Sequence, residues 1–182
     1  MKKAIVFIDG SNFYYRLKHI IKKGDGNTSL LDFNYQKFCL WLCKDFEVVE
    51  IRYYIGVVRR KNKDQKSQKL YNNQQKLFRK LQKHKVQIVL GMLIQRPDKT
   101  YHEKGVDVRL AVEMIKSARE DKYDTAFLIS SDTDLVPAVE EVLSLGKKVK
   151  YIGAPDSQSF GLSKITGDYL ILRPEDVKPF LK

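Results

Sequence analysis

The sequence predicts an α/β fold of three layers, in which a central, mainly parallel sheet of about five strands is flanked by helices. Two observations lead to this prediction. Apolar runs of strand length alternate along the chain with stretches of helical periodicity. The runs are unbroken series of Val, Ile, Leu and Phe, which is typical of parallel strands covered on both faces.

The first third of the chain alternates between the two kinds of element. Lys3–Ile8 is a continuous apolar run and predicts the first strand, and a helix is expected from about Ser11 to Lys22. Gly24–Ser29 is typical of a loop because of its glycines and small polar residues. A second helix near Asn34–Cys43 then leads into the second strand, Val48–Val58.

The next segment, Asn62–Lys83, predicts a long amphipathic helix. The residues that share its apolar side at helical spacing are Leu70, Gln74, Leu77, Phe78 and Leu81. The residues on its opposite side are Lys69, Lys76, Arg79, Lys80 and Lys83. We expect a short strand, Val86–Leu90, to follow it, and then an irregular stretch that contains Pro97.

The remaining predicted elements continue the alternation. A helix is expected over Val106–Arg119, a strand over Thr125–Ile129 and a helix over Asp134–Leu145. Gly146 is placed to end that last helix, since glycine readily adopts the left-handed conformation that follows a helix C-terminus. Lys148–Ile152 is the fifth predicted strand.

We find no linker, internal repeat or low-complexity boundary in the sequence. A chain of 182 residues is long enough for one domain with a buried core. We therefore predict a single domain over residues 1–182, in which 154–182 form a C-terminal extension packed on the rest.

The chain shows no feature of a membrane or secreted protein. Its longest apolar runs are strand-sized, and the run Ala4–Ile8 after the basic start is too short for a signal peptide. Cys39 and Cys43 lack a nearby pair of His or Cys partners for a metal, and we interpret them as buried, reduced thiols. A cytoplasmic location is the prediction, because thiols stay reduced there.

The net charge of +12 is concentrated in one segment. Arg59–Lys85 holds eleven Lys or Arg residues against one acid, Asp64, so it carries +10, and the rest of the chain carries only +2. A helix with many charges is often only a solvated surface. The size and one-sided placement of this excess nevertheless favour a polyanion as partner, and we expect RNA phosphates to bind there.

Four acidic residues are set against this basic background. Asp9 directly follows the first predicted strand, and Asp132 lies just beyond the fourth. Asp107 and Asp134 fall in the first turns of predicted helices. In open parallel sheets the functional crevice lies beyond the carboxyl ends of the strands, so at least Asp9 and Asp132 are expected at that crevice.

Each acidic motif also has a purely structural explanation. Ser11 or Asn12 can cap the helix after the first strand, and Ser131 and Asp134 have the spacing of a capping box. Asp107 can complement the macrodipole of its helix. Capping needs only one acid at each helix start, however, and a set of oxygen ligands without His or Cys suits Mg²⁺ or Mn²⁺. Such ions stabilise charge on a phosphoryl group and activate water.

Three motifs carry a resemblance to a known family. They are Asp9 with Asn12, K-G-V-D at 104–107, and S-S-D-T-D-L-V-P at 130–137. In this order, over about residues 3–153, they resemble a NYN domain, and within it the LabA-like branch of the PIN-like nuclease superfamily. The resemblance implies a PIN-like, Rossmann-like fold, a pocket for Mg²⁺ or Mn²⁺, and hydrolysis of RNA phosphodiester bonds.

The resemblance also implies roles for individual residues. Asp9, Asp107, Asp132 and Asp134 would be metal ligands and, with Asn12, the catalytic residues. Ser131 would be a supporting polar group in contact with substrate, and Lys104 would lie at the margin of the pocket. The basic helix is outside the family pattern, and its expected substrate-binding residues follow from charge alone. They are Lys69, Lys76, Arg79, Lys80 and Lys83.

Several tyrosines are candidates for stacking on unpaired bases. Tyr53, Tyr54 and Tyr71 lie near the basic segment, and Tyr14 and Tyr15 follow Asn12 near the expected mouth of the pocket. The bland alternative is that most of them are ordinary, partly buried core residues.

Three functions remain open from the sequence. The first is a metal-dependent ribonuclease acting on single-stranded or structured RNA. The second is a non-catalytic NYN module with a regulatory role that binds RNA or a protein. The third is a Mg²⁺-dependent enzyme acting on small phosphorylated substrates, which the lack of a G-x-x-x-x-G-K phosphate loop disfavours. Exposed edges of a parallel sheet would also allow a homodimer.

Overall fold

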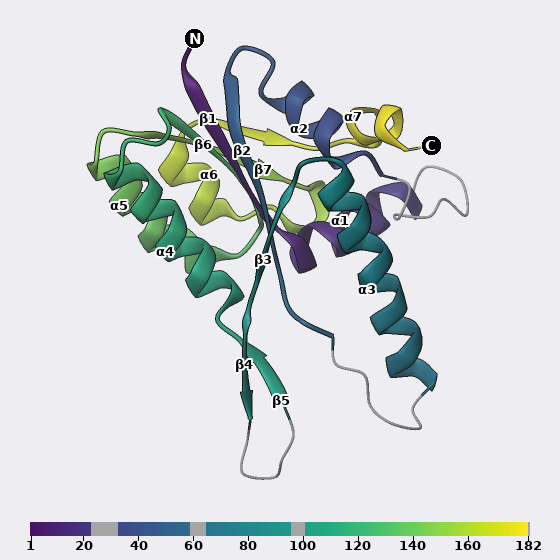
Figure 1. Cartoon of the computed structure of the whole chain (residues 1–182). Helices are drawn as coiled ribbons and strands as arrows, with labels where there is room; N and C mark the ends of the chain where they lie inside the picture. Colours follow the sequence, from purple (N-terminus) through teal and green to yellow (C-terminus); the bar gives the residue numbers. More distant parts are fainter. Residues whose placement is uncertain (23–32, 59–64, 96–100, 182) are drawn as a thin grey trace.

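The computed structural model describes residues 1–22, 33–58, 65–95 and 101–181. Within them, six parallel strands form a central sheet in the order β3-β2-β1-β6-β7-β8, with helices on both faces (Figure 1). The predicted three-layer α/β fold is therefore confirmed. The chain builds β2 and β3 on one side of β1 and then returns to its other side with β6, so the strand order reverses between β1 and β6.

The strands of the sheet are β1 (Lys3–Asp9), β2 (Glu47–Ile55), β3 (Gln87–Leu90), β6 (Thr125–Ile129), β7 (Lys148–Gly153) and β8 (Tyr169–Ile171). The first five agree with the predicted strands. The sixth, β8, comes from the tail of the chain, where the sequence pattern was too short to assign. Ile8 of β1 pairs with Ile129 of β6, so these two strands end together at the edge that lies beside the switch point.

The helices are divided between the two faces of the sheet according to the alternation of side chains along the strands. Ala4, Val6 and Ile8 of β1 pack in one core with α1 (Gly10–Lys22), α2 (Tyr35–Leu42), α3 (Gln65–Lys83) and α7 (Pro174–Val177). Ile5 and Phe7 pack in the other core with α4 (Val106–Arg119), α5 (Val136–Ser144) and α6 (Phe160–Thr166). Asp9 continues the second series, so its side is that of α4.

Some boundaries differ from the predictions for physical reasons. β2 ends at Ile55 rather than Val58, because the Gln74 side chain of α3 binds the backbone that follows it: Nε2 donates to the Gly56 carbonyl at 2.6 Å, and Oε1 accepts from the Val58 amide at 2.8 Å. The helix predicted from Asp134 begins instead with a short 3₁₀ turn, Thr133–Leu135. Gly146 follows α5 with φ of 75°, as its predicted role at the helix end requires.

The prediction of an irregular stretch around Pro97 was wrong in part. It contains an antiparallel pair, β4 (Met92–Gln95) and β5 (Tyr101–Lys104), which projects from the body of the molecule (Figure 1). Each strand has only four residues, too few for an alternating pattern to be recognised. Pro97 itself, the predicted loop Gly24–Ser29 and the start of the basic helix before Gln65 lie outside the described residues.

One smaller expectation is also met. Cys39 and Cys43 are free and buried, as interpreted from the sequence. None of the helices in the described ranges has the length and apolar character needed to cross a membrane.

Candidate functional site

Four aspartates gather at the carboxyl edge of the sheet, and we call them the acidic edge: Asp9, Asp107, Asp132 and Asp134. Asp9 is the last residue of β1, and Asp132 follows the end of β6 on the other side of the switch point. Asp107 lies in the first turn of α4, and Asp134 lies in the 3₁₀ turn before α5. The fold thus brings residues from three separate segments of the chain to the place where open parallel sheets form their functional crevice.

Asp9 is the buried member of this group, with 5% of its surface exposed. Its Oδ1 accepts a hydrogen bond from the backbone amide of Asn12 at 3.0 Å, so Asp9 itself caps α1, in place of Ser11 or Asn12. Its Oδ2 accepts from the hydroxyl of Ser130 at 2.9 Å. The Ser130 hydroxyl in turn accepts the backbone amide of Asp132 at 3.1 Å. One serine therefore connects the two aspartates across the switch point.

A second polar chain lies beside the first. The Ser131 hydroxyl donates to Oδ1 of Asn12 at 3.0 Å and accepts from Nε of Arg16 at 3.3 Å. The capping-box alternative for Ser131 is therefore not realised, since Asp132 Oδ1 accepts the Asp134 amide at 3.0 Å and caps the 3₁₀ turn. Arg16 was missed by sequence reasoning. The available signal was its position one helical turn after Asn12, which puts both side chains on one face of α1.

The electrostatics show that the four carboxylates influence one another. Burial is the main factor that raises the pKa of Asp9, and the charges of Asp107 and Asp132 raise it further, while the hydrogen bonds from Asn12 and Ser130 lower it. Burial is also the main factor that raises the pKa of Asp107, followed by the charge of Asp132, with a further contribution from Asp134. A cation at this edge would offset the same repulsion.

The ligand types at the acidic edge suit a hard divalent cation better than the spacing of its side chains does. The ligand atoms that the side chains of the four aspartates, Asn12 and Ser131 offer to a metal are all oxygens, which Mg²⁺ and Mn²⁺ prefer. In the part of the chain that the structure describes, however, no group of three or more His, Cys, Asp or Glu side chains is arranged to hold a metal ion. An ion that binds through one or two carboxylates and retains several waters, as Mg²⁺ commonly does, does not require such a group.

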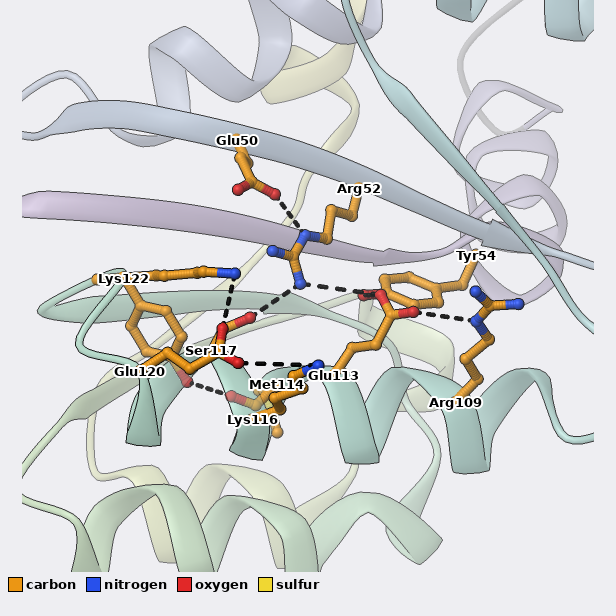
Figure 2. Close-up of polar contacts among 11 residues, drawn as sticks. Glu50, Arg52, Tyr54, Arg109, Glu113, Met114, Lys116, Ser117, Glu120 and Lys122 are labelled. Carbon is orange, nitrogen blue, oxygen red and sulfur yellow. Dashed lines mark hydrogen bonds and ion pairs between the residues drawn. The ribbon is translucent and has the colours of Figure 1, made fainter.

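A buried arginine, Arg52, links β2 to α4, the helix whose first turn holds Asp107 (Figure 2). Arg52 of β2 donates through Nη1 to the Ser117 hydroxyl at 2.9 Å and lies 3.8 Å from Oε2 of Glu113. The hydroxyl of Tyr54, also on β2, donates to the same Glu113 oxygen at 2.9 Å. Because Ser117 and Glu113 belong to α4, these bonds hold the helix that starts with Asp107 against the sheet.

Tyr53 and Tyr54 are core residues, the alternative to base stacking that the sequence left open, because both side chains are fully buried. In a central strand covered on both faces, adjacent side chains are buried in opposite cores. Tyr53 donates its hydroxyl to the Gly10 carbonyl at 3.1 Å. A Cβ on Gly10 would lie 2.3 Å from Cε1 of Tyr53 and 2.6 Å from the Tyr54 carbonyl oxygen, so this close contact requires glycine directly after Asp9.

The basic helix α3 has the orientation that its sequence predicts, with one exception. Gln74, Leu77 and Leu81 are buried against the sheet. The cations that are exposed on its other side are Lys69, Lys76, Arg79 and Lys83, while Lys80 is half-buried. The exception is Leu70, which was expected on the buried side but has 51% of its surface exposed. Lys104, the predicted margin residue, ends β5 directly before Gly105 and α4, and its side chain lies outside the described residues.

Comparison with known proteins places this geometry in a family. A family model of the NYN domain matches residues 3–171, which is most of the chain. The chain belongs to the NYN domain family. The NYN domain has a PIN-like nuclease fold, and the three motifs that suggested it lie within the matched residues.

One solved structure resembles this NYN domain along its whole length. It is a crystal structure of a protein of unknown function from Vibrio parahaemolyticus, with a TM-score of 0.68 and 22% sequence identity, covering 100% of this chain and 96% of the other. This likeness supports the fold. A search of curated proteins gave no match.

Proposed function

We propose that this NYN domain is a metal-dependent ribonuclease of the LabA-like branch, which hydrolyses RNA phosphodiester bonds at the acidic edge. The observation that carries the proposal is the buried Asp9 at the switch point. Burial, and then the charges of Asp107 and Asp132, raise the pKa of its carboxyl group. A basic protein that collects mutually repelling carboxylates at this point is suited to bind a divalent cation and a phosphate.

Asp9, Asp107, Asp132 and Asp134 would hold Mg²⁺ or Mn²⁺, directly or through water. When bound, such an ion supplies charge neutralisation at the phosphoryl group and an activated water. The reaction adds water across a P–O bond, so one RNA fragment ends in a phosphate and the other in a hydroxyl.

Neighbouring side chains would orient the phosphodiester. Asn12 uses its Oδ1 to accept the Ser131 hydroxyl, so its amide N–H groups are turned to donate to a phosphate oxygen. Arg16 is held by the same Ser131 and supplies a fixed positive charge beside the carboxylates. Such pre-set donors stabilise a developing negative charge without reorganisation.

The exposed cations of α3 would bind the RNA backbone on either side of the cleaved bond. Lys69, Lys76, Arg79 and Lys83 bind phosphates through charge, so this contact does not depend on base sequence. It would raise affinity for RNA in a manner that falls steeply with salt.

The experiment that tests the proposal measures cleavage of labelled single-stranded RNA with Mn²⁺ by the wild-type protein and by Asp9→Asn and Asp132→Asn variants. A matched control is Asp168→Asn, which neutralises an exposed acid that pairs with Lys150 away from the acidic edge. We expect cleavage by the wild type and the control only. Equal cleavage by all four proteins would refute the proposal.

A second candidate is a non-catalytic NYN module that holds RNA or a protein partner. One observation favours it, namely that the described residues include no group of three or more potential ligands arranged to hold a metal ion. It predicts RNA binding that is sensitive to salt, persists in EDTA and leads to no turnover with any metal. Turnover of a free nucleotide but not of RNA would instead favour a small-substrate enzyme.

A further inference from the structure

A pocket of about 360 Å³ lies beside the acidic edge, and none of the residues that line it belongs to the hydrogen-bonded chains of Ser130 and Ser131 described above. It is formed by the start of α1, the carboxyl end of β2 and one side of α3. We call it the tyrosine pocket. The residues that matter for its chemistry are Tyr14, Tyr15, Tyr35, Tyr53, Leu70 and Asn73. Its size is within the range of sites that enclose small organic groups.

The inner part of the tyrosine pocket is built from buried rings and hydrogen-bonded backbone. Tyr35 and Tyr53 are fully buried at its base, with ring centroids 5.3 Å apart in an edge-to-face arrangement. The wall between β2 and α3 is fixed by Gln74, whose amide binds the backbone of Gly56 and Val58 through both its ends. A pocket held in this way is formed before any ligand arrives.

The mouth of the pocket exposes large apolar surfaces. The rings of Tyr14 and Tyr15, 40% and 67% exposed, lie 5.7 Å apart at 81°. Leu70 faces them from α3 and has half of its surface exposed, although the helical pattern places it on the buried side. Isolated exposed apolar residues are ordinary, but three that line one concave site mark a surface that a flat apolar group can cover.

The pocket also adjoins the groups proposed to act on RNA. Gly10 and Ser11 line it and directly follow Asp9 in the chain. Burial is the main factor that raises the pKa of Tyr53, followed by its neighbour Tyr35, and the charge of Asp9 contributes as well, so Asp9 lies close to this ring. On α3, the exposed cations Lys69 and Lys76 lie four residues before and three after Asn73, so they flank the mouth.

From this arrangement we infer that the tyrosine pocket receives an unpaired nucleobase of an RNA strand whose neighbouring phosphate lies at the acidic edge. The inference rests on the proposed function. A nucleobase offers a flat ring for Tyr14 and Tyr15 and polar edges for the Asn73 amide, and its backbone would run past the cations of α3. A base inside a duplex is stacked and paired and does not enter, so the pocket selects single-stranded RNA.

The test uses RNA that carries one fluorescent 2-aminopurine, whose emission is quenched when the base stacks. The protein is the Asp132→Asn variant, so that binding is measured without cleavage. We compare it with the same variant carrying Tyr14→Ala, or Leu70→Trp to fill the pocket, and with a Tyr169→Ala control on β8 at the far edge of the sheet. We expect quenching in the parent and the control, and affinity weaker by about 5- to 150-fold in the two pocket variants.

The outcomes separate this inference from the proposed function. If the wild type cleaves RNA while quenching and affinity are unchanged in both pocket variants, the binding of a base by the tyrosine pocket is refuted. The proposed ribonuclease activity then still stands. Quenching that depends on the pocket, in a protein that never cleaves RNA, would keep the pocket and refute the ribonuclease. Two results would overturn the assignment to an RNA strand. One is equal affinity for the free 2-aminopurine ribonucleotide and for the RNA. The other is equal affinity for the single-stranded RNA and for its duplex.

Discussion

The hydroxyl of Ser130 donates a hydrogen bond of 2.9 Å to Oδ2 of Asp9, although the two residues are 121 positions apart in the chain. They directly follow Ile129 and Ile8, the last residues at which β6 and β1 pair, and lie on the two sides of the switch point. Because Ser130 also accepts the Asp132 amide, this bond determines how the two acidic segments of the site face each other.

Replacing Ser130 with Ala should destabilise the protein by about 1–3 kcal/mol, since it leaves a buried carboxylate oxygen without its donor. The loss should be greater above the raised pKa of Asp9, where its carboxylate is charged, than below it. Urea denaturation at several pH values measures it. Ser144→Ala, which removes an exposed hydroxyl at the end of α5, is the control and should cost less. An equal loss in both variants would show that the bond to Asp9 has no special weight.

The raised pKa of Asp9 predicts a pH dependence of folding stability in metal-free buffer. A carboxyl group whose folded pKa lies above its ordinary value of 3.8 binds its proton more tightly in the folded state. Stability should therefore fall as pH rises from 3.8 through the raised pKa, and the full cost should persist above it. Asp9→Asn removes this cost and should be more stable than wild type above the raised pKa.

Denaturation of the two proteins across this pH range measures the difference, which should vanish below the ordinary pKa. Addition of Mn²⁺ should stabilise the wild type and not the Asp9→Asn variant, because ligands stabilise the state that binds them. A variant that is less stable than wild type at neutral pH would contradict the account of Asp9 as a strained carboxylate.

Replacing the buried Arg52 should lower the free energy of unfolding more than replacing a surface arginine. Arg52→Met removes the partner of Ser117, Glu113 and Glu50 and should cost about 1.5–3 kcal/mol, since charged hydrogen bonds are lost at a buried site. Arg119→Met breaks an exposed ion pair with Glu141 and should cost less than about 1 kcal/mol. Chemical denaturation of both variants tests the contrast. RNA cleavage at a temperature where both stay folded should fall only in Arg52→Met, as α4 shifts Asp107.

The cations of α3 should contribute to RNA affinity through counterion release. The double variant Lys76→Glu and Lys83→Glu should bind single-stranded RNA more weakly and reduce the slope of log affinity against log salt by about 1–2. The control reverses two exposed lysines elsewhere, Lys148 and Lys178. Fluorescence anisotropy over a salt series gives both quantities. The same slope in both double variants would mean that α3 is only a solvated surface.

Much of this fold follows from the sequence because apolar runs and helical periods are strong signals. The runs at Lys3–Ile8 and Thr125–Ile129 could be assigned as buried parallel strands, and this places Asp9 at the end of a strand and Asp132 just beyond one. The antiparallel pair of β4 and β5 could not be assigned, because each strand has only four residues. The strand Tyr169–Ile171 is shorter still, and only its pairing with β7 makes it part of the sheet.

The site could be predicted in outline but not in its contacts. The motifs identified the acids, whereas the roles of Ser130 and Arg16 depend on which segments meet across the switch point. Burial of Tyr53 and Tyr54 depends on helices covering both faces of β2, which adjacent tyrosines in a sequence do not reveal. Leu70 is the opposite case, because it stands on the apolar side of the helical pattern and is nevertheless exposed. The pattern does not determine whether a neighbouring element covers a side chain.

The central claim, that the acidic edge binds a divalent cation in order to cleave RNA, is tested most directly by the cleavage rate as a function of Mn²⁺ concentration. We predict that the wild-type rate rises from zero in EDTA to a plateau. At saturating Mn²⁺, Asp132→Asn should be slower by at least about 100-fold, while Asp168→Asn follows the wild type. Cleavage by the wild type in EDTA, or a full rate in Asp132→Asn, would contradict it.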